Sequence, residues 1–262
     1  MKIVILAGGK SERIKPFYEK PLLKFCGKTL IHHQLEILFE AGGRDFLIIG
    51  SEKNIQQIKT EAEKFVQSEQ GVKVDFGKQV IDEGSAGALK SVEINQLFSE
   101  GEDKGLMIVS SNDILELSAY TGLLETVKRH SNCSVILGQQ VNSYFPGGYL
   151  MVNDQNRLLK IVEKPGAGNE PSNLINIVAH YHPSAVQMME FLNKASSSTD
   201  DLYETALDNM IQAGHEIKVA HYLGKWQPIK YPWHIYDAAK ILFEKEIRVR
   251  RRQDSPLIAD DL

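Results

Sequence analysis

The sequence contains very little cysteine. Cys26 and Cys133 are the only two cysteines among 262 residues, and they lie far apart with no metal-like spacing. A chain of this length, with 42% hydrophobic residues, can bury a sizeable core without a disulfide. We therefore expect two free thiols, as in a reducing compartment.

Long apolar runs and an excess of basic residues are also missing. The apolar run at the N-terminus stops at Gly8 and Gly9, and no other run approaches the roughly 18 residues that a membrane span needs. The formal net charge of −4 argues against general nucleic-acid binding. We expect a cytoplasmic protein with no membrane or nucleic-acid partner. Any site for a polyanion must then be a local group of Lys and Arg.

Apolar runs alternate with amphipathic segments along the first half of the chain. Strands are predicted at 3–6, 45–49, 73–76 and 105–109, and helices at 30–41, 55–65 and 86–98. This rhythm predicts an α/β fold with a mostly parallel sheet flanked by helices on both faces. Ligands bind such sheets beyond the carboxyl ends of the strands, here the loops after Leu6, Phe76 and Val109.

The second half is richer in strands. Strands are predicted at 134–137, 149–152, 158–162 and 175–181, and helices at 203–213 and 233–247. Because few helices separate these strands, we expect an antiparallel extension on the substrate side. The chain then divides into one domain over residues 1–245 and a basic and polar tail over 246–262. The tail is either a solvated end or a linker to a further module.

The loop after the first strand carries the features of a phosphate site. Gly8 and Gly9 let backbone N–H groups approach a phosphate closely, because no Cβ intervenes. Arg13, Lys15 and Lys20 follow, and a guanidinium can hold phosphate oxygens with two hydrogen bonds. A glycine turn with surface basic residues is the alternative interpretation.

This loop resembles the signature of the sugar-1-phosphate nucleotidylyltransferases. The matching pieces are Leu6-Ala7-Gly8-Gly9, Ser11, Arg13, Pro16, Lys20-Pro21-Leu22-Leu23 and Gly27-Lys28. The third glycine of a dinucleotide fingerprint is missing. The resemblance implies a three-layer Rossmann-like, GT-A-like fold. It also implies an NTP and a sugar 1-phosphate as substrates, and Mg²⁺ as cofactor.

The resemblance continues in the predicted nucleotide site. Gln79, Gly84 and Ser85 are similar to the family's Gln, Gly-Thr-Ala element, whose Gln amide reads the base edge. Such an amide suits uracil or thymine, which favours UTP or dTTP. For Gln79, an exposed polar strand end is the alternative. The nucleotide-binding residues that the resemblance implies are Leu6, Ala7, Gly8, Gly9, Gln79, Gly84 and Ser85.

Asp113 matches the Asp that holds Mg²⁺ in the family, with Asn112 where Gly is usual. A carboxylate at the carboxyl end of a buried strand suits a hard cation. A helix N-cap is the alternative role for Asp113.

Further matches imply a sugar-phosphate site. Val162-Glu163-Lys164-Pro165 matches the family's Val-Glu-Lys-Pro, in which Glu accepts hydrogen bonds from sugar hydroxyls and Lys contacts the sugar phosphate. The sugar-phosphate residues implied are Gly148, Glu163, Lys164 and Asn176. The catalytic residues implied are Arg13, Lys20, Asp113 and Lys164.

The sequence departs from the family pattern at two places. Val178 stands where a Gly normally lets the sugar lie against the backbone, so its side chain would crowd a hexose. Pro228 stands where the family has a second Asp for magnesium, and Lys230 stands where Gly is usual. The run at 231–233, Tyr-Pro-Trp, resembles a mainly archaeal-type subgroup of the family.

Together these features predict a nucleotidylyltransferase of the EC 2.7.7 type. It would make an NDP-sugar and pyrophosphate from UTP or dTTP and a sugar such as glucose 1-phosphate. Two alternatives stay open: inositol or choline phosphate as acceptor, and a non-catalytic nucleotide-sugar-binding regulatory subunit. Self-association is also left open. His180 and His182 alternate along one strand and are expected to be core or solvated histidines rather than ligands.

Overall fold

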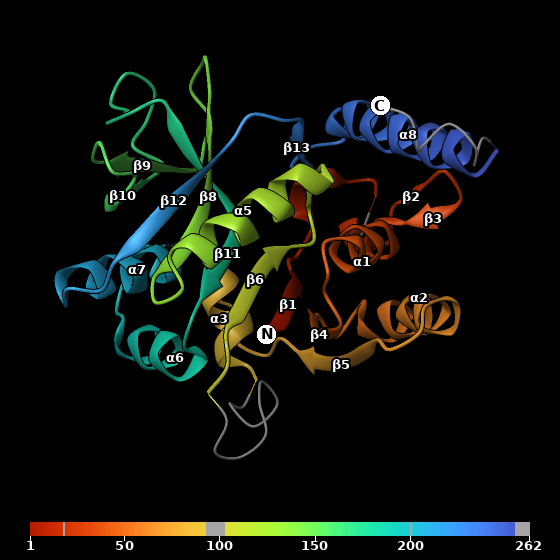
Figure 1. The fold of residues 1–262 in the computed structure, drawn as a ribbon, viewed down its shortest axis with the longest axis horizontal. Helices are drawn as coiled ribbons and strands as arrows, with labels where there is room; N and C mark the ends of the chain where they lie inside the picture. The colour runs from red at the N-terminus through yellow and green to blue at the C-terminus, as the bar shows by residue number, and fades with distance from the viewer. Residues whose placement is uncertain (18, 93–102, 200, 255–262) are drawn as a thin grey trace.

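The fold is built around a nine-stranded mixed sheet (Figure 1). The computed structural model describes residues 1–17, 19–92, 103–199 and 201–254. The parallel part of the sheet has the order β6-β1-β4-β5, formed by β1 (Lys2–Ala7), β4 (Asp45–Gly50), β5 (Lys73–Lys78) and β6 (Leu106–Ser110). After a charged first residue, β1 and β4 are continuous apolar runs, because helices cover both of their faces.

The antiparallel extension is also confirmed. Strand β11 (Leu174–His182) runs antiparallel to β6 and joins the two parts of the sheet. Beyond it lie β8 (Ser134–Gln140), β9 (Gly148–Val152), β10 (Leu158–Glu163) and β12 (Ile217–Tyr222). The pairing of β11 with β8 shifts register between Ile177 and His180, around Val178.

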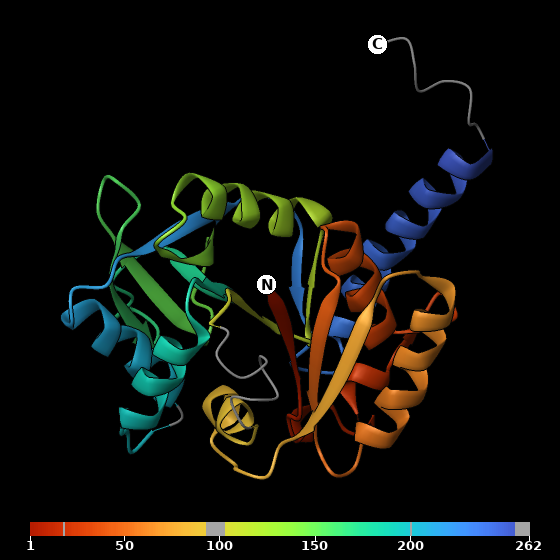
Figure 2. The same ribbon diagram turned by 60° about the horizontal axis from the view of Figure 1, so that its bottom comes forward.

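Helices cover both faces of the sheet, as predicted (Figure 2). One face packs against α1 (Leu30–Glu40), α2 (Ile55–Ser68) and α5 (Leu117–Arg129). The other face packs against α3 (Gly84–Lys90), α6 (Ala185–Lys194) and α7 (Leu202–Gln212). The helix predicted at 86–98 begins two residues earlier, and α3 ends at Lys90; residues 93–98 lie outside the described part of the chain.

A third apolar cluster lies beside the carboxyl ends of the strands. Helix α8 (His234–Asp254) and the short elements η1 (Glu12–Ile14), η2 (Lys20–Leu22), β2 (Lys24–Phe25), β3 (Lys28–Thr29), β7 (Asp113–Leu115) and β13 (Trp226–Pro228) complete the fold. In the cluster, Ile14 of η1, Phe25 of β2, Leu30 of α1, Ile114 of β7 and Ile229, which follows β13, pack with Ala238 and Leu242 of α8. This packing holds the loop after β1 against the loop after β6.

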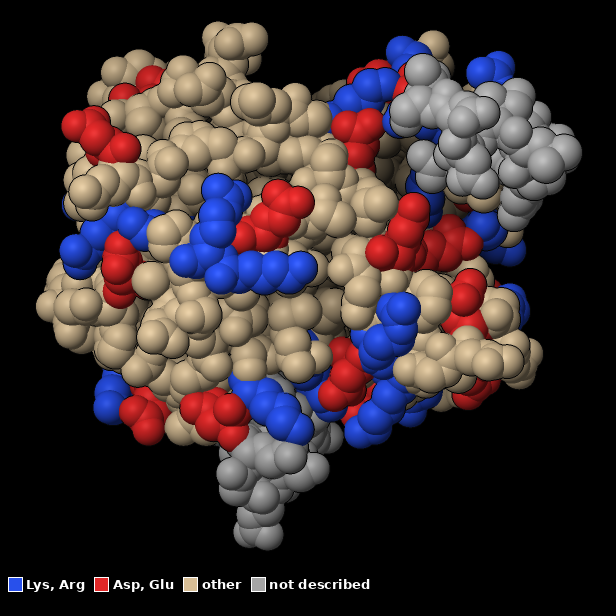
Figure 3. All heavy atoms as spheres, viewed as in Figure 1, with Lys and Arg blue, Asp and Glu red and all other residues tan. Residues whose placement is uncertain are grey.

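Helix α8 continues through position 246, where the basic tail was predicted to begin. The division at that position stays a prediction, and residues 255–262 lie outside the described part. None of the described helices combines the length and the apolarity that crossing a bilayer requires. Acidic and basic side chains are interspersed over the face seen in Figure 3, in keeping with the small net charge.

Candidate active site

The loops after β1, β5 and β6 meet at one cavity of about 710 Å³. Its lining includes the predicted nucleotide-binding residues other than Ala7, namely Leu6, Gly8, Gly9, Gln79, Gly84 and Ser85, together with the predicted catalytic residues Arg13 and Lys20. Ser110, Asn112 and Val178 also line it. This is the edge of the parallel sheet at which the sequence predicted a ligand, so the three loops are brought together as expected.

Gly8 and Gln79 pack directly against each other. A Cβ at Gly8 would lie 2.2 Å from Gln79 Oε1, so a larger residue at position 8 would force the Gln79 side chain to move. Gln79 Nε2 donates hydrogen bonds to the backbone oxygens of Ile81 (2.9 Å) and Gly84 (3.2 Å). Gln79 is half-buried rather than an exposed strand end. Its amide therefore shapes the loop at 79–84, and its reading of a base stays a prediction.

Asn54 anchors the same loops and was not singled out from the sequence. It is fully buried, and its Nδ2 donates to Ala7 O (2.9 Å) and Glu19 Oε2 (2.8 Å). The signal that could have found it is its position just after β4, at the same edge of the sheet. Asn54 ties the end of β1 to the residue that precedes Lys20.

Lys20 is a buried cation that lines the cavity. It is only 8% exposed, and it has no ion pair with a carboxylate in the described residues. Its backbone N donates to Ser11 Oγ (3.3 Å), and Ser11 adopts a left-handed conformation (φ 55). Burial, and then the neighbouring Arg13, lower the pKa of Lys20, whereas Asp113 raises it. A buried ammonium without a counterion is costly, so this arrangement is typical of a site for an anion.

Asp113 lies in a strand rather than at a helix N-terminus. It begins β7, and α5 begins only at Leu117, so the alternative role as an N-cap is wrong. Asp113 Oδ1 accepts a hydrogen bond from Trp226 Nε1 (2.9 Å). Burial raises the pKa of Asp113, although hydrogen bonds from Trp226 and Ser110 oppose the shift.

Pro228 is the residue paired with Asp113 in the small β7–β13 sheet. The family's second carboxylate would therefore lie directly across from Asp113, and here that position is apolar. Nearby, Asn112 Oδ1 and Ser111 Oγ are buried without a hydrogen-bond partner in the described structure. Asn112 was treated in the sequence only as a replacement for glycine.

The predicted sugar-phosphate residues form a second group. A Cβ at Gly148 would lie 3.0 Å from Glu163 Oε2 and 3.5 Å from Asn176 Cβ, so these three residues are immediate neighbours. Lys164 Nζ lies 3.0 Å from Glu163 Oε1. Val178 lies two residues beyond Asn176 and lines the large cavity. That its side chain crowds a hexose stays a prediction.

Lys230 lies between the two groups. Its Nζ donates to Pro146 O (2.7 Å) and lies 3.9 Å from the centroid of the Phe145 ring. Burial lowers the pKa of Lys230 to about 8. The charges that act on it include Asp113 and Arg13 from the nucleotide side and Glu163 and Lys164 from the sugar side.

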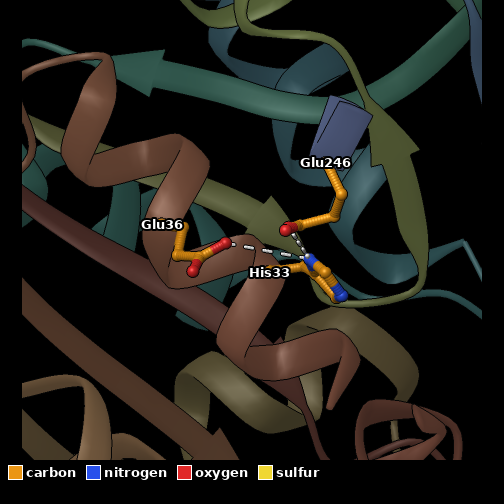
Figure 4. Close-up of side chains that lie close together, drawn as sticks. All are labelled: His33, Glu36 and Glu246. Atoms are coloured by element: carbon orange, nitrogen blue, oxygen red, sulfur yellow. Dashed lines mark ion pairs between the residues drawn. The ribbon is translucent and has the colours of Figure 1, made fainter. Parts of the chain in front are cut away.

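A separate charged cluster joins α8 to α1 (Figure 4). His33 Nδ1 faces Glu36 and Glu246, with 3.8 Å to a carboxylate oxygen of each. Lys28 Nζ already lies 2.6 Å from Glu36 and 3.3 Å from Glu246, and Lys245 lies 3.3 Å from Glu36. Because ammonium groups neutralise both carboxylates, we assign this cluster a structural role in fixing α8.

This chain is similar to curated proteins that are named as nucleotidyltransferases. A bifunctional sugar-1-phosphate nucleotidylyltransferase/acetyltransferase of Sulfurisphaera tokodaii is 31% identical over 244 residues, covering 92% of this chain and 55% of the relative. A mannose-1-phosphate guanyltransferase 2 of Candida glabrata is 30% identical over 172 residues, covering 63% of this chain and 45% of the relative. The chain thus spans about half the length of these curated relatives.

The fold is shared with solved structures. A UDP-glucose pyrophosphorylase crystallised with UDP-glucose superposes with a TM-score of 0.77 at 17% identity, covering 93% of this chain and 98% of that one. At that identity the likeness establishes the fold alone. The family model for nucleotidyl transferases matches residues 2–240, so the chain belongs to the nucleotidyl transferase family.

Proposed function

We propose that this chain transfers a nucleoside monophosphate from an NTP to a sugar 1-phosphate and releases pyrophosphate. The observation that carries the proposal is the buried ammonium of Lys20, which lines a 710 Å³ cavity beside Gly8 and Gly9. The names of the relatives support the same reaction class. The resemblance of the segments around Gln79 and Glu163 to the family pattern favours UTP or dTTP and a sugar 1-phosphate such as glucose 1-phosphate.

In the proposed reaction, an oxygen of the sugar phosphate attacks the α-phosphorus of the NTP. The new O–P bond forms as the bond to the β-phosphate oxygen breaks, and pyrophosphate leaves with that electron pair. The attacking oxygen is already anionic, so no general base is required. Catalysis then consists of positioning and charge neutralisation.

The described residues divide these tasks between the two sides of the site. The backbone of Gly8 and Gly9, with Arg13 and Lys20, would hold the triphosphate and the leaving pyrophosphate. Lys164 would hold the phosphate of the acceptor. Lys230, which lies between these groups, would neutralise the phosphates that meet during transfer.

Mg²⁺ fits the residues at the start of β7. A hard cation prefers oxygen ligands. The carboxylate of Asp113 is one, and the buried, unpaired Asn112 Oδ1 is a second. When bound there, the ion would neutralise charge on the phosphate oxygens.

Pyrophosphate release is the direct test. UTP, dTTP, CTP and GTP should be crossed with a panel of sugar and polyol phosphates in the presence of Mg²⁺. A productive pair, lost in Lys20→Met, would establish the transferase and name both substrates. Nucleotide binding without release across the whole panel would refute it. That result would favour a regulatory subunit, for which Pro228 opposite Asp113 is the specific observation.

A further inference from the structure

A chain of buried hydrogen bonds leads through the core to Asn176. Ser134 Oγ on β8 lies 3.0 Å from His182 Nδ1, and His182 Nε2 lies 3.1 Å from Tyr203 OH on α7. The same Tyr203 OH lies 2.9 Å from His180 Nδ1, and His180 Nε2 lies 2.8 Å from Asn176 Oδ1. The hydroxyl of Tyr203 thus joins helix α7 to strand β11, which supplies both histidines and Asn176.

Both histidines are neutral in this environment. His180 and His182 are 0% exposed, and burial lowers the pKa of each to about 3. A neutral imidazole has one donor and one acceptor nitrogen, so each ring passes the direction of hydrogen bonding from one side to the other. Tyr203 OH does the same, because it donates one hydrogen bond and accepts another.

The donor-to-acceptor direction of this series of hydrogen bonds is therefore set at its Asn176 end. The amide oxygen of Asn176 faces His180, and an oxygen can only accept, so His180 Nε2 carries the proton. His180 Nδ1 then accepts from Tyr203 OH, which in turn accepts from His182 Nε2–H. His182 Nδ1 finally accepts from Ser134. Each link is satisfied in this single direction, which a buried polar network requires.

We propose that Ser134, His182, Tyr203 and His180 are positioning residues that hold Asn176 as a hydrogen-bond donor to the acceptor substrate. This inference rests on the proposed function. With Asn176 Oδ1 taken by His180, only Nδ2–H remains to meet the substrate. Glu163 Oε2 and Asn176 Cβ lie 3.0 and 3.5 Å from the same point beside Gly148, so Asn176 has a neighbouring carboxylate, which is an acceptor when ionised.

A fixed donor beside a fixed acceptor matches hydroxyl groups, which both accept and donate. The acceptor substrate is therefore a phosphate that carries hydroxyls, a sugar or a polyol. Choline phosphate has no hydroxyl for either group, and a buried or enclosed polar group without a partner is costly. This selects between the acceptors that the sequence left open.

The tautomers of the two histidines give a test without substrate. In ¹⁵N-histidine-labelled protein, long-range ¹H–¹⁵N spectra should show both rings neutral and protonated at Nε2 at pH 7, with assignment from His180→Gln and His182→Gln. Protonation at Nδ1 in either ring would mean the reverse direction, with the amide oxygen of Asn176 facing the substrate. That result would overturn the inference.

Kinetics tests the role in binding. Tyr203→Phe removes the hydroxyl that fixes His180, so KM for the sugar phosphate should rise about tenfold, the effect of one hydrogen bond, with KM for the NTP unchanged. Tyr222→Phe is the matched control, since Tyr222 is also buried, 4% exposed, and hydrogen-bonded to Lys225 O (2.8 Å) on the opposite side of the sheet. Equal KM values in the two variants would refute the role.

A double-mutant cycle assigns the effect to Asn176. If the hydrogen-bond chain acts through that side chain, Tyr203→Phe should change KM for the sugar phosphate by less than twofold in an Asn176→Ala background. A full tenfold effect there would show that Tyr203 acts elsewhere. Nε2 tautomers in a protein that turns over no substrate pair would instead refute the proposed function alone.

Discussion

Replacing Lys20 with methionine should make the free protein more stable and the enzyme inactive. Methionine keeps an apolar stem of similar length but removes the buried charge. Lys20 is 8% exposed and has no ion pair in the described residues, so its charge is held in place without a carboxylate partner. The structure thus predicts that Lys20→Met raises the stability of the free protein and lowers its turnover.

The size of the stability gain follows from this burial. An unpaired buried ion costs several kcal/mol in a closed core. Because Lys20 lines an open cavity and lies near Asp113, we expect a gain of about 1–2 kcal/mol. For a chain of this size that corresponds to a rise in Tm of about 2–8 °C. Turnover should fall by about 10²–10³, the usual effect of losing one stabilising donor.

The pH dependence has a defined sign. Burial lowers the pKa of Lys20 in the folded protein, so the unfolded chain binds more protons above that pKa. The free-energy cost of burying the charged Lys20 is fully present below its folded-state pKa, and it disappears as the pH rises toward 10.5. The advantage of Lys20→Met should therefore shrink at alkaline pH.

Thermal unfolding with and without nucleotide is the assay. NTP at 100 times its Kd should stabilise the wild type by about 2.7 kcal/mol, and this stabilisation should be lost in Lys20→Met. Lys53→Met, at an exposed lysine outside the cavity, is the control and should change neither Tm nor turnover. A Lys20→Met protein less stable than the wild type would show that the charge is compensated, and would refute the anion-site reasoning.

Three further predictions follow from local geometry. Asn112→Gly should weaken Mn²⁺ binding about tenfold, as measured by EPR, because it removes a ligand oxygen. Adding Pro228→Asp to this variant should restore the binding. Unchanged Mn²⁺ binding in Asn112→Gly would exclude the Asn112 amide as a ligand. Burial and a neighbouring carboxylate, Glu163, raise the pKa of Glu204 to about 7, so folding loses stability as the pH rises from 4.5 through 7. Glu204→Gln should thus be stabilising by on the order of 2 kcal/mol in urea unfolding at pH 8 and near neutral at pH 4. Gly87→Ala should lower the free energy of unfolding by about 1–3 kcal/mol, because its Cβ would lie 2.3 Å from the backbone oxygen of Ile81. Gly122→Ala, whose Cβ would have no atom within 4 Å, should raise it by about 0.5–1 kcal/mol in the same urea unfolding experiment.

The parallel part of the fold could be predicted because its signals are local. The apolar residues of β1 and β4 form uninterrupted runs, and Gly8 follows β1 while Gly50 is the last residue of β4. The loop at 6–20 likewise carries its glycines and cations within one short segment. Such features need no knowledge of distant residues.

Contacts between distant residues could not be predicted in this way. Tyr203 lies 23 positions from His180, and Ser134 lies 48 positions from His182, so the sequence could not distinguish buried, hydrogen-bonded histidines from solvated ones. The helices α5 and α6 were missed for a related reason. Their apolar residues, such as Tyr120 and Met188, gain their burial from strands that lie elsewhere in the chain.

The departures at 112, 228 and 230 lie together in space. Pro228 pairs with Asp113, and Ile229 N donates to Asn112 O (2.9 Å), which places Lys230 beside the same site. Two carboxylates with one divalent cation sum to zero charge, and so do Asp113 and Lys230 by themselves. Lys230 can therefore supply part of the positive charge that the family pattern draws from a tightly held metal.

This charge balance predicts that removing the Lys230 ammonium changes metal affinity and turnover in opposite directions. Lys230→Met should tighten Mn²⁺ binding, because the ammonium no longer repels a cation near Asp113, and should lower turnover at saturating metal by about 10²-fold, because a charge on the transferring phosphates is lost. EPR of free Mn²⁺ and pyrophosphate release measure the two effects. Lys225→Met, at an exposed lysine just before β13, is the control and should leave both unchanged. If Mn²⁺ binding weakens together with turnover in Lys230→Met, then Lys230 supports the metal site structurally and does not replace any of its charge.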